Sequence, residues 1–263
     1  MTQSQTRTVG SVDEVIERMQ AIKAQLDPRD GVACFNRMYL RVTELVGQNL
    51  VAGFFEDQAF IERMDVIFAG LYFDAVDAAA KRPAAAGNWA APLLGAAQAV
   101  NGHSQTHEAW QPLFDARNNR TIWPIQFAFA GMNAHINHDL ALAVIDTCTE
   151  RGTTPDTAPV YADYLRVNEL LAKVEAEIRA SFEAELIKVT TKDAETLKHI
   201  LGAFSIARAR DSAWATAQSL WHQRSLRPSY DATLATVATA TATIGRALLV
   251  PVLPPVEQPD GHN

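Results

Sequence analysis

The sequence predicts an all-α protein, a single-domain helical bundle arranged around a central buried helix at about residues 124–147. Apolar residues recur at spacings of three and four along most of the chain, which is the period of an amphipathic helix. No segment alternates polar and apolar residues between turn signals, as strands do. A repeat with a period of roughly 20–50 residues is not visible either. Because 263 residues is near the upper size of one hydrophobic core, we expect a single helical domain over residues 11–250.

Local signals place the individual helices. Ser11 and Glu14 form the pattern of a capping box, so the first helix is expected to run from there to about Leu26. Asp57 is a candidate N-cap for a helix that continues to about residue 80, and Pro124 stands in the first turn of the central helix. Further helices are expected around residues 35–49, 91–101, 160–188, 193–224, with a break near Ser205, and 228–249. Residues 1–10, which are polar, and the Pro-rich tail 251–263 are expected to be disordered.

Composition limits the partners. A net charge of -7 and a pI near 5.5, with no local cluster of Lys and Arg, argue against binding to nucleic acid. No apolar run is long enough to cross a membrane, and the polar N-terminus does not resemble a signal peptide. Cys34 and Cys148 lie far apart in apolar helical stretches, which fits a reducing compartment. We therefore expect a cytoplasmic protein that binds a small molecule and touches neither membrane nor nucleic acid; its oligomeric state stays open.

The segment GMNAHINHDL at 131–140 carries the strongest candidates for chemistry. His135 and Asp139 are four residues apart and therefore project from one face of a helix. His138 follows His135 by three residues, so it is a tentative third partner. Neutral imidazole and carboxylate suit zinc or ferrous iron, which predicts a single divalent metal held by these residues.

The apolar flanks of this segment, FAFAG and LALAVI, would bury its polar side chains. A buried carboxylate needs a cation, a shifted pKa or hydrogen bonds. Three interpretations stay open: a metal site, a catalytic site without metal, and a structural network of Asn133, His135, Asn137 and Asp139.

Other polar residues fall on apolar helix faces. Asp65 lies within the apolar stripe of the helix at 57–80, either as a further metal ligand or as the ion-pair partner of Arg210. His103 and His107 have the spacing of a ligand pair, but their polar surroundings favour exposed side chains. No GxGxxG after a strand and no Walker loop occurs, so no nucleotide cofactor is expected. The GxSxG elbow, the CxxC motif and the paired ExxH motifs of di-iron bundles are missing as well.

Several segments resemble an actinobacterial family that is catalogued as a domain of unknown function. They are ERMDVIFAGLYFDAVD at 62–77, WQPLFDAR at 110–117, IQFAFAGMNAHINHDLALAV at 125–144, YLRVNELLAKVE at 164–175 and ARDSAWATAQSLW at 209–221. The resemblance spans about residues 33–250 and implies the same helical fold, with its centre at the NAHINHDL core. The matching polar positions are Asp65, Tyr72, Asn133, His135, Asn137, Asp139, Asn168, Arg210, Asp211 and Trp214. Some members of the family stand near genes of specialised metabolism.

His135 with Asp139 is also similar to the HxxxD helices of zinc-dependent phospholipase C and the single-strand nucleases. The chain departs from that pattern, because it has no matching N-terminal Trp and no second HxxxD.

These observations predict an enzyme that acts on a small, largely apolar metabolite in a pocket around His135 and Asp139. The candidate catalytic residues are His135, Asp139, Asp65 and Arg210, and the candidate substrate-binding residues are Asn133, Asn137, Tyr72 and Trp214. Cyclisation, isomerisation, dehydration and metal-assisted chemistry all stay open. The alternatives are a zinc-dependent phosphoester or ester hydrolase and a non-catalytic helical small-molecule-binding protein.

Overall fold

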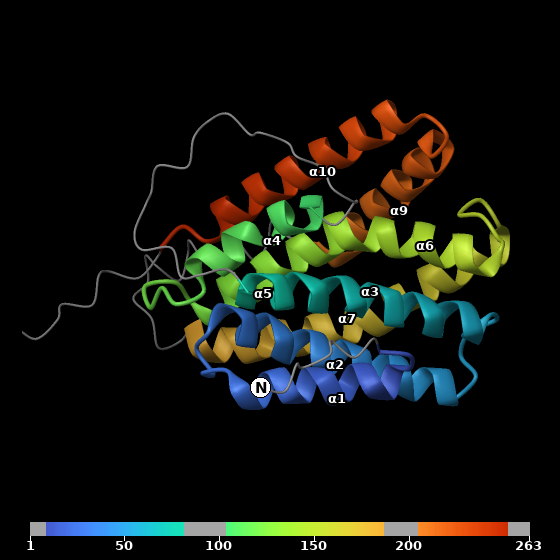
Figure 1. Cartoon of the computed structure of the whole chain (residues 1–263). Coiled ribbons are helices and arrows are strands. Elements are labelled where there is room, and N and C mark those ends of the chain that lie inside the picture. Colours follow the sequence, from blue (N-terminus) through green and yellow to red (C-terminus); the bar gives the residue numbers. More distant parts are fainter. Residues whose placement is uncertain (1–8, 82–103, 187–204, 252–263) are drawn as a thin grey trace, which may run out of the picture.

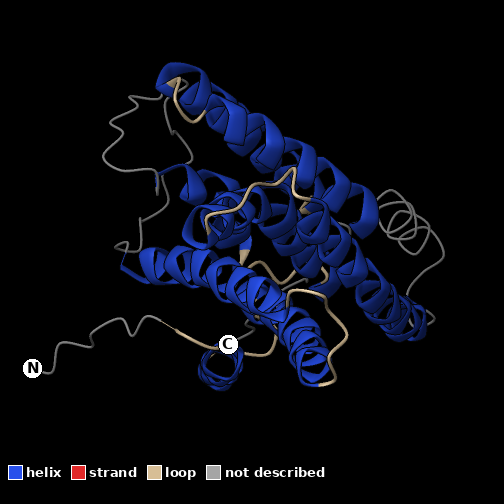
Figure 2. Ribbon diagram, turned by 90° about the vertical axis from the view of Figure 1, so that its right-hand side faces the viewer, coloured by secondary structure: helices blue, strands red, loops and turns tan. Residues whose placement is uncertain are grey.

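The structure is a computed structural model that describes residues 9–81, 104–186 and 205–251, and within these ranges all regular structure is helical (Figure 2). The predicted all-α class is therefore confirmed. The predicted helix at 91–101 lies outside the described residues, as do nearly all of the two ends predicted to be disordered.

The N-terminal part forms three helices, α1 (Val12–Gln25), α2 (Gly31–Val51) and α3 (Gln58–Lys81). Each begins at the polar residue that its sequence indicates. The Ser11 hydroxyl accepts from the Glu14 amide at 3.3 Å, and the Asp57 carboxylate accepts from the Phe60 amide at 2.9 Å. Asp30 caps α2, which therefore starts four residues before Phe35, the first apolar residue of its predicted stripe. The Glu14 carboxylate accepts from the Gly10 amide, one residue before the Ser11 amide of the predicted capping box.

The middle of the chain forms α4 (Ser104–Ala116), α5 (Pro124–Ala134), a π-helical turn η1 (His135–Asp139) and α6 (Leu140–Arg151). The predicted central helix around residues 124–147 is thus confirmed, with two details added by the structure. It contains a π turn, in which the Leu140 amide bonds to the His135 carbonyl, and it continues to Arg151. Gly152, with φ 65°, adopts the left-handed conformation that ends it.

The C-terminal part forms α7 (Ala158–Leu186), α9 (Ile206–Gln223) and α10 (Arg227–Leu248). Ser205, where a break was expected, is the N-cap of α9, and its hydroxyl accepts from the Arg208 amide at 3.4 Å. Residues 187–204, which include the start of the predicted helix at 193–224, lie outside the described part of the chain.

The helix formed by α5, η1 and α6 passes through the middle of the bundle, with α1 and α2 on one side and α9 and α10 on the other (Figure 1). Every residue of α5 from Ile125 to Ala134 is buried. α2 packs against α5, α3 against α6, and α9 against η1 and α6. This arrangement packs α3, α4, α9 and α10 against the π turn, and α2 reaches it through the rings of Phe35 and Tyr39, which contact His135.

None of the described helices is long and apolar enough to cross a membrane.

Candidate functional site

The Asp139 carboxylate, which is completely buried, is the centre of the polar cluster. Its Oδ2 lies 3.1 Å from His135 Nδ1 and accepts from Trp110 Nε1 at 2.8 Å. Its Oδ1 lies 2.8 Å from His138 Nδ1. Three side chains from two segments of the chain therefore converge on one carboxylate.

The π turn brings both histidines to this carboxylate. Its wide i to i+5 hydrogen bonding changes the direction of the side chains that follow, and such turns often occur at functional sites. His135 reaches Asp139 from one turn away and His138 reaches it from the neighbouring position.

The hydrogen bonds fix the tautomer of both rings. Burial would raise the pKa of Asp139, but the hydrogen bonds from His135 and His138 outweigh it and hold that pKa below its ordinary value. Burial also lowers the pKa of His135, although Asp139 partly opposes this shift. An ionised carboxylate only accepts hydrogen bonds, so each ring donates its Nδ1–H to Asp139, and His135 in its neutral form presents a lone pair at Nε2.

His135 lies in an aromatic surround. Its ring stacks on Phe68, with 3.5 Å between centroids and 5° between planes, and meets the Tyr39 ring edge-on at 4.5 Å. His135 Nε2 is buried and has no hydrogen-bond partner. His138 Nε2 is likewise buried and unpartnered, but His138 does not line the cavity described next.

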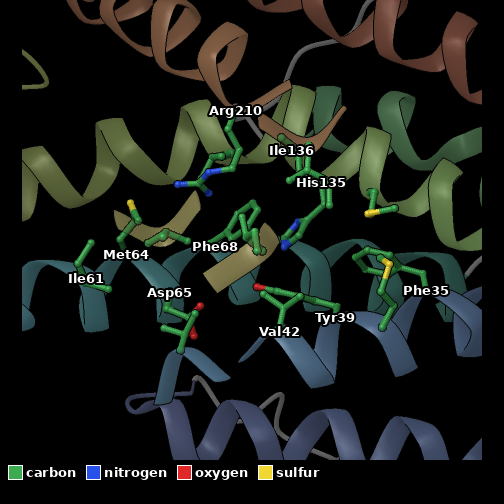
Figure 3. A pocket seen from close by; sticks show the side chains of 17 residues that line it. Phe35, Tyr39, Val42, Ile61, Met64, Asp65, Phe68, His135, Ile136 and Arg210 are labelled. Carbon is green, nitrogen blue, oxygen red and sulfur yellow. The ribbon is translucent and has the colours of Figure 1, made fainter. Parts of the chain in front are cut away.

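A cavity opens in front of His135, between α2, α3, η1 and α9 (Figure 3). The cavity volume is about 70 Å³, several times the roughly 10–15 Å³ that one water needs. Among the described residues of the lining, four are polar: Tyr39, Asp65, His135 and Arg210. The apolar lining comprises Phe35, Met38, Val42, Val46, Ile61, Met64, Phe68, Met132, Ile136, Leu140, Val167, Leu171 and Ile206.

Asp65 and Tyr39 face this cavity from α3 and α2 (Figure 3). Asp65 Oδ2 and the Tyr39 hydroxyl are both buried without a hydrogen-bond partner. Burial raises the pKa of Asp65 to about 7. The pKa of Tyr39 is also raised, by burial first and then by the nearby carboxylates of Asp65 and Asp139. Near neutral pH the cavity therefore holds a phenol and a partly protonated carboxyl.

Arg210 approaches the cavity from α9 and is 4% exposed. Its Nε donates to Asn168 Oδ1 at 2.6 Å, its Nη2 donates to the Tyr164 carbonyl at 2.8 Å, and its guanidinium lies 4.1 Å from the centroid of the Tyr164 ring. No salt bridge joins it to Asp65, so the ion pair considered from the sequence does not form between these two described residues. Burial lowers the pKa of Arg210, although arginine stays protonated in proteins.

Four predicted substrate-binding residues lie elsewhere, since none of them lines the cavity. Asn133 Nδ2 donates to the Thr241 carbonyl of α10 at 2.8 Å, and its Oδ1 accepts from Asn137 at 3.0 Å. The Tyr72 hydroxyl donates to Asn36 Oδ1 at 3.2 Å, and Trp214 packs on Tyr164 with 4.4 Å between centroids. The asparagines therefore hold α10 against α5, and the two aromatic residues belong to the core.

The predicted metal at His135, Asp139 and His138 stays a prediction. Both imidazoles turn Nδ1 toward Asp139, and their unpartnered Nε2 atoms are the positions left for another ligand. Within residues 9–81, 104–186 and 205–251, no group of three or more His, Cys, Asp or Glu side chains is placed to hold a metal ion. His103 and the side chain of His107 lie outside what the structure describes.

Sequence reasoning missed two members of the site, Trp110 and Tyr39. Trp110 opens the segment WQPLFDAR, and a buried indole N–H usually needs an acceptor, which is the signal that could have indicated it. Tyr39 lies in an apolar helical stretch, where a phenol carries a hydroxyl that needs a partner, and that hydroxyl is the signal that could have indicated it.

A family model described as a family of unknown function, DUF5995, matches residues 12–99 and 87–251. Together these matches span most of the chain, in agreement with the resemblance seen in the sequence. No curated protein and no solved structure matches the chain.

Proposed function

Since the chain belongs to DUF5995, a family of unknown function, we propose a function from the geometry of the site: an enzyme in which His135 and Asp139 act as a general base. The substrate is a small, largely apolar metabolite bound in the cavity that His135, Tyr39, Asp65 and Arg210 line.

The observation that carries this proposal is the unpartnered Nε2 of His135 at the wall of an apolar cavity. A buried acceptor without a partner costs about 1–3 kcal/mol, so folding alone does not favour this arrangement. A ligand with an acidic C–H or O–H group would satisfy it. Asp139 holds the ring in the tautomer that can take a proton, as the carboxylate does in a catalytic triad.

The chemistry that fits is proton transfer. His135 Nε2 removes a proton from the substrate, Asp139 stabilises the imidazolium that forms, and the proton returns to another substrate atom. The positive charge of Arg210, with hydroxyl donors on Tyr39 and on protonated Asp65, would stabilise negative charge that develops on a substrate oxygen. Isomerisation, cyclisation and dehydration are the reaction classes that need only these steps.

A non-catalytic binding protein is the second candidate, because thirteen of the seventeen lining residues are apolar and would hold a ligand without chemistry. The third candidate, a zinc-dependent ester or phosphoester hydrolase, needs three protein ligands, and the described residues offer no such group. Elemental analysis of protein purified without chelator separates that candidate from the first two.

Proton abstraction can be tested before the substrate is known. Small apolar ketones and unsaturated acids are incubated with the protein in deuterium oxide, and NMR follows the incorporation of deuterium at carbon. We expect wild-type protein to exchange at least one compound and His135→Gln to reduce that rate by at least 100-fold, within the range of general-base catalysis.

His222→Gln is the matched control, because His222 is exposed and pairs with Asp156 far from the cavity. It should exchange at the wild-type rate. Exchange that survives His135→Gln would refute the assignment of the base. Tight binding of a compound without any exchange would favour the non-catalytic candidate.

A further inference from the structure

Arg210 is the one residue in the described cavity lining whose charge does not depend on pH in the physiological range. Its two hydrogen bonds go to neutral acceptors, the Asn168 amide and the Tyr164 carbonyl. Of the five N–H groups of a guanidinium these bonds use two. No described carboxylate forms a salt bridge with it, and Asp211, the next residue along α9, is exposed.

A buried cation without an anion is costly, so such a group is usually paired. Asp65 lines the same cavity but does not supply that anion, because it forms no salt bridge with Arg210 and burial favours its protonated form. Arg210 is therefore the permanently charged group of the described lining, and it has no anionic partner there while Asp65 is protonated.

From this charge pattern, and resting on the proposed function, we propose that the metabolite is an apolar monocarboxylate whose head group pairs with Arg210. The apolar body lies against Met64, Phe68 and the neighbouring aliphatic side chains. One guanidinium matches the single charge of a carboxylate and its two oxygens. A phosphate dianion would need a second cation, which the described lining lacks.

The direction of the four polar side chains agrees with this assignment. Arg210 and His135 extend into the cavity from α9 and η1, while Asp65 and Tyr39 face them from α3 and α2 (Figure 3). A carboxylate held by Arg210 would lie in the same cavity as the base. A protonated Asp65 could donate to the second carboxylate oxygen.

The test uses two matched pairs of probes, hexanoate with hexanamide and phenylacetate with phenylacetamide. Each pair shares its apolar body and differs in charge. Calorimetry and ligand-observed NMR on the full chain give the affinities. We expect at least one carboxylate to bind wild-type protein about 10–100-fold more tightly than its amide, the range of a charge-assisted hydrogen-bonded pair.

Arg210→Met should abolish this preference because it weakens carboxylate binding far more than amide binding, whereas Arg210→Lys should keep part of the preference. Arg18→Met is the control, since Arg18 also lies over an aromatic ring, 4.4 Å from the Phe73 centroid, but pairs with Asp77 outside the cavity. If Arg210→Met fails to fold, the ratio of carboxylate to amide affinity in wild-type protein and in Arg210→Lys still tests the proposal. Equal affinities within both pairs, no binding of either carboxylate, or a preference that Arg210→Met retains would overturn the proposal.

The two proposals fail separately. His135→Gln should lose deuterium exchange and keep the preference for carboxylate over amide. A carboxylate preference without exchange by wild-type protein would remove the proposed base and leave this inference standing. Exchange of neutral compounds without any carboxylate preference would remove this inference and leave the proposed base standing.

Discussion

At the scale of single residues, the site depends on one carboxylate, that of Asp139, which only accepts hydrogen bonds. Asp139 has no lysine or arginine partner among the described residues, and it is held by Trp110, His135 and His138. Charge-assisted hydrogen bonds of this kind stabilise an ionised carboxylate in an apolar interior. The same bonds set which nitrogen of His135 is free, so structural and chemical roles are linked in one group.

Asp139→Asn tests this link. Trp110 Nε1, which only donates, shares Oδ2 with His135 Nδ1, so the asparagine oxygen stays at that position and the amide N–H group faces His138, which would then carry its proton on Nε2. We expect the folded protein to persist, with a free energy of unfolding lowered by about 1–3 kcal/mol. Nitrogen NMR of labelled histidine should show the His138 tautomer changed from Nδ1–H to Nε2–H, and deuterium exchange should fall because a neutral amide no longer stabilises the imidazolium of His135.

Asp156→Asn is the control for the preceding variant, because Asp156 is an exposed carboxylate that also lies near a histidine, with 3.3 Å to His222 Nε2. It should leave the signals of both buried histidines in place. An Asp139→Asn protein whose His138 keeps its proton on Nδ1 would show that Asp139 does not set the tautomer.

Residue spacing predicted part of this cluster and could not predict the rest. The four-residue interval between His135 and Asp139 indicated their contact correctly, since that interval is local. Trp110 reaches Asp139 across 29 residues, and Asn133 reaches Thr241 across 108. Such contacts depend on how helices pack, which no local period specifies, so Asn133 was assigned to the ligand although it holds α10.

At the scale of elements, the π turn at His135–Asp139 is the feature that sequence periodicity concealed. The apolar run that flanks it reads as one continuous helix. A π turn inserts one residue into that period, and no residue type in HINHD signals it. Its cost is offset by contacts made only in the folded bundle, here the hydrogen bonds to Asp139.

The crossing of α2 and α5 positions the aromatic wall of the cavity. Gly131 lets α5 approach Phe35, because a Cβ at Gly131 would lie 2.7 Å from the Phe35 Cβ and closer still to its ring. The Phe35 ring in turn lies 5.7 Å from the His135 ring, centroid to centroid. We therefore expect Gly131→Ala to lower the free energy of unfolding by about 1–3 kcal/mol despite the better helix propensity of alanine, measured by urea titration.

Gly70→Ala in α3 is the matched control, since nothing lies within 4 Å of a Cβ at that position. It should stabilise the protein by up to about 1 kcal/mol, the helix-propensity gain alone. A Gly131→Ala protein as stable as Gly70→Ala would show that α2 and α5 separate without cost.

At the scale of the whole molecule, the all-helical class and the position of most helices followed from the sequence. Helical periodicity, the caps at Ser11, Asp57 and Ser205, and Pro124 are local signals, and the structure agrees with each within a few residues. The cavity could not be predicted, because its walls come from helices far apart in the chain. Asp65 and Arg210 both reach it without forming the ion pair that their chemistry suggested.

Asp65 makes the stability of the whole protein depend on pH. Its pKa of about 7 when folded lies above the value near 3.9 expected when unfolded, so the folded state keeps a proton that the unfolded state releases. The proton that folded Asp65 retains contributes fully to the free energy of unfolding below about pH 4, and this contribution is lost as pH rises toward about 7. Its size is about 4 kcal/mol at most. Asp65→Asn removes this dependence, so the variant should gain stability over wild-type protein as pH increases.

Urea unfolding followed by circular dichroism at about pH 5 and pH 8 measures the difference. We expect Asp65→Asn to exceed wild-type stability more at pH 8 than at pH 5, by roughly 1–3 kcal/mol once the more compact unfolded chain is allowed for. Asp231→Asn, an exposed carboxylate near Arg227, should leave the wild-type pH dependence unchanged. Equal gains at both pH values would mean that Asp65 is already paired or solvated in the folded protein. In that case the cavity would not carry the single positive charge that the carboxylate assignment requires.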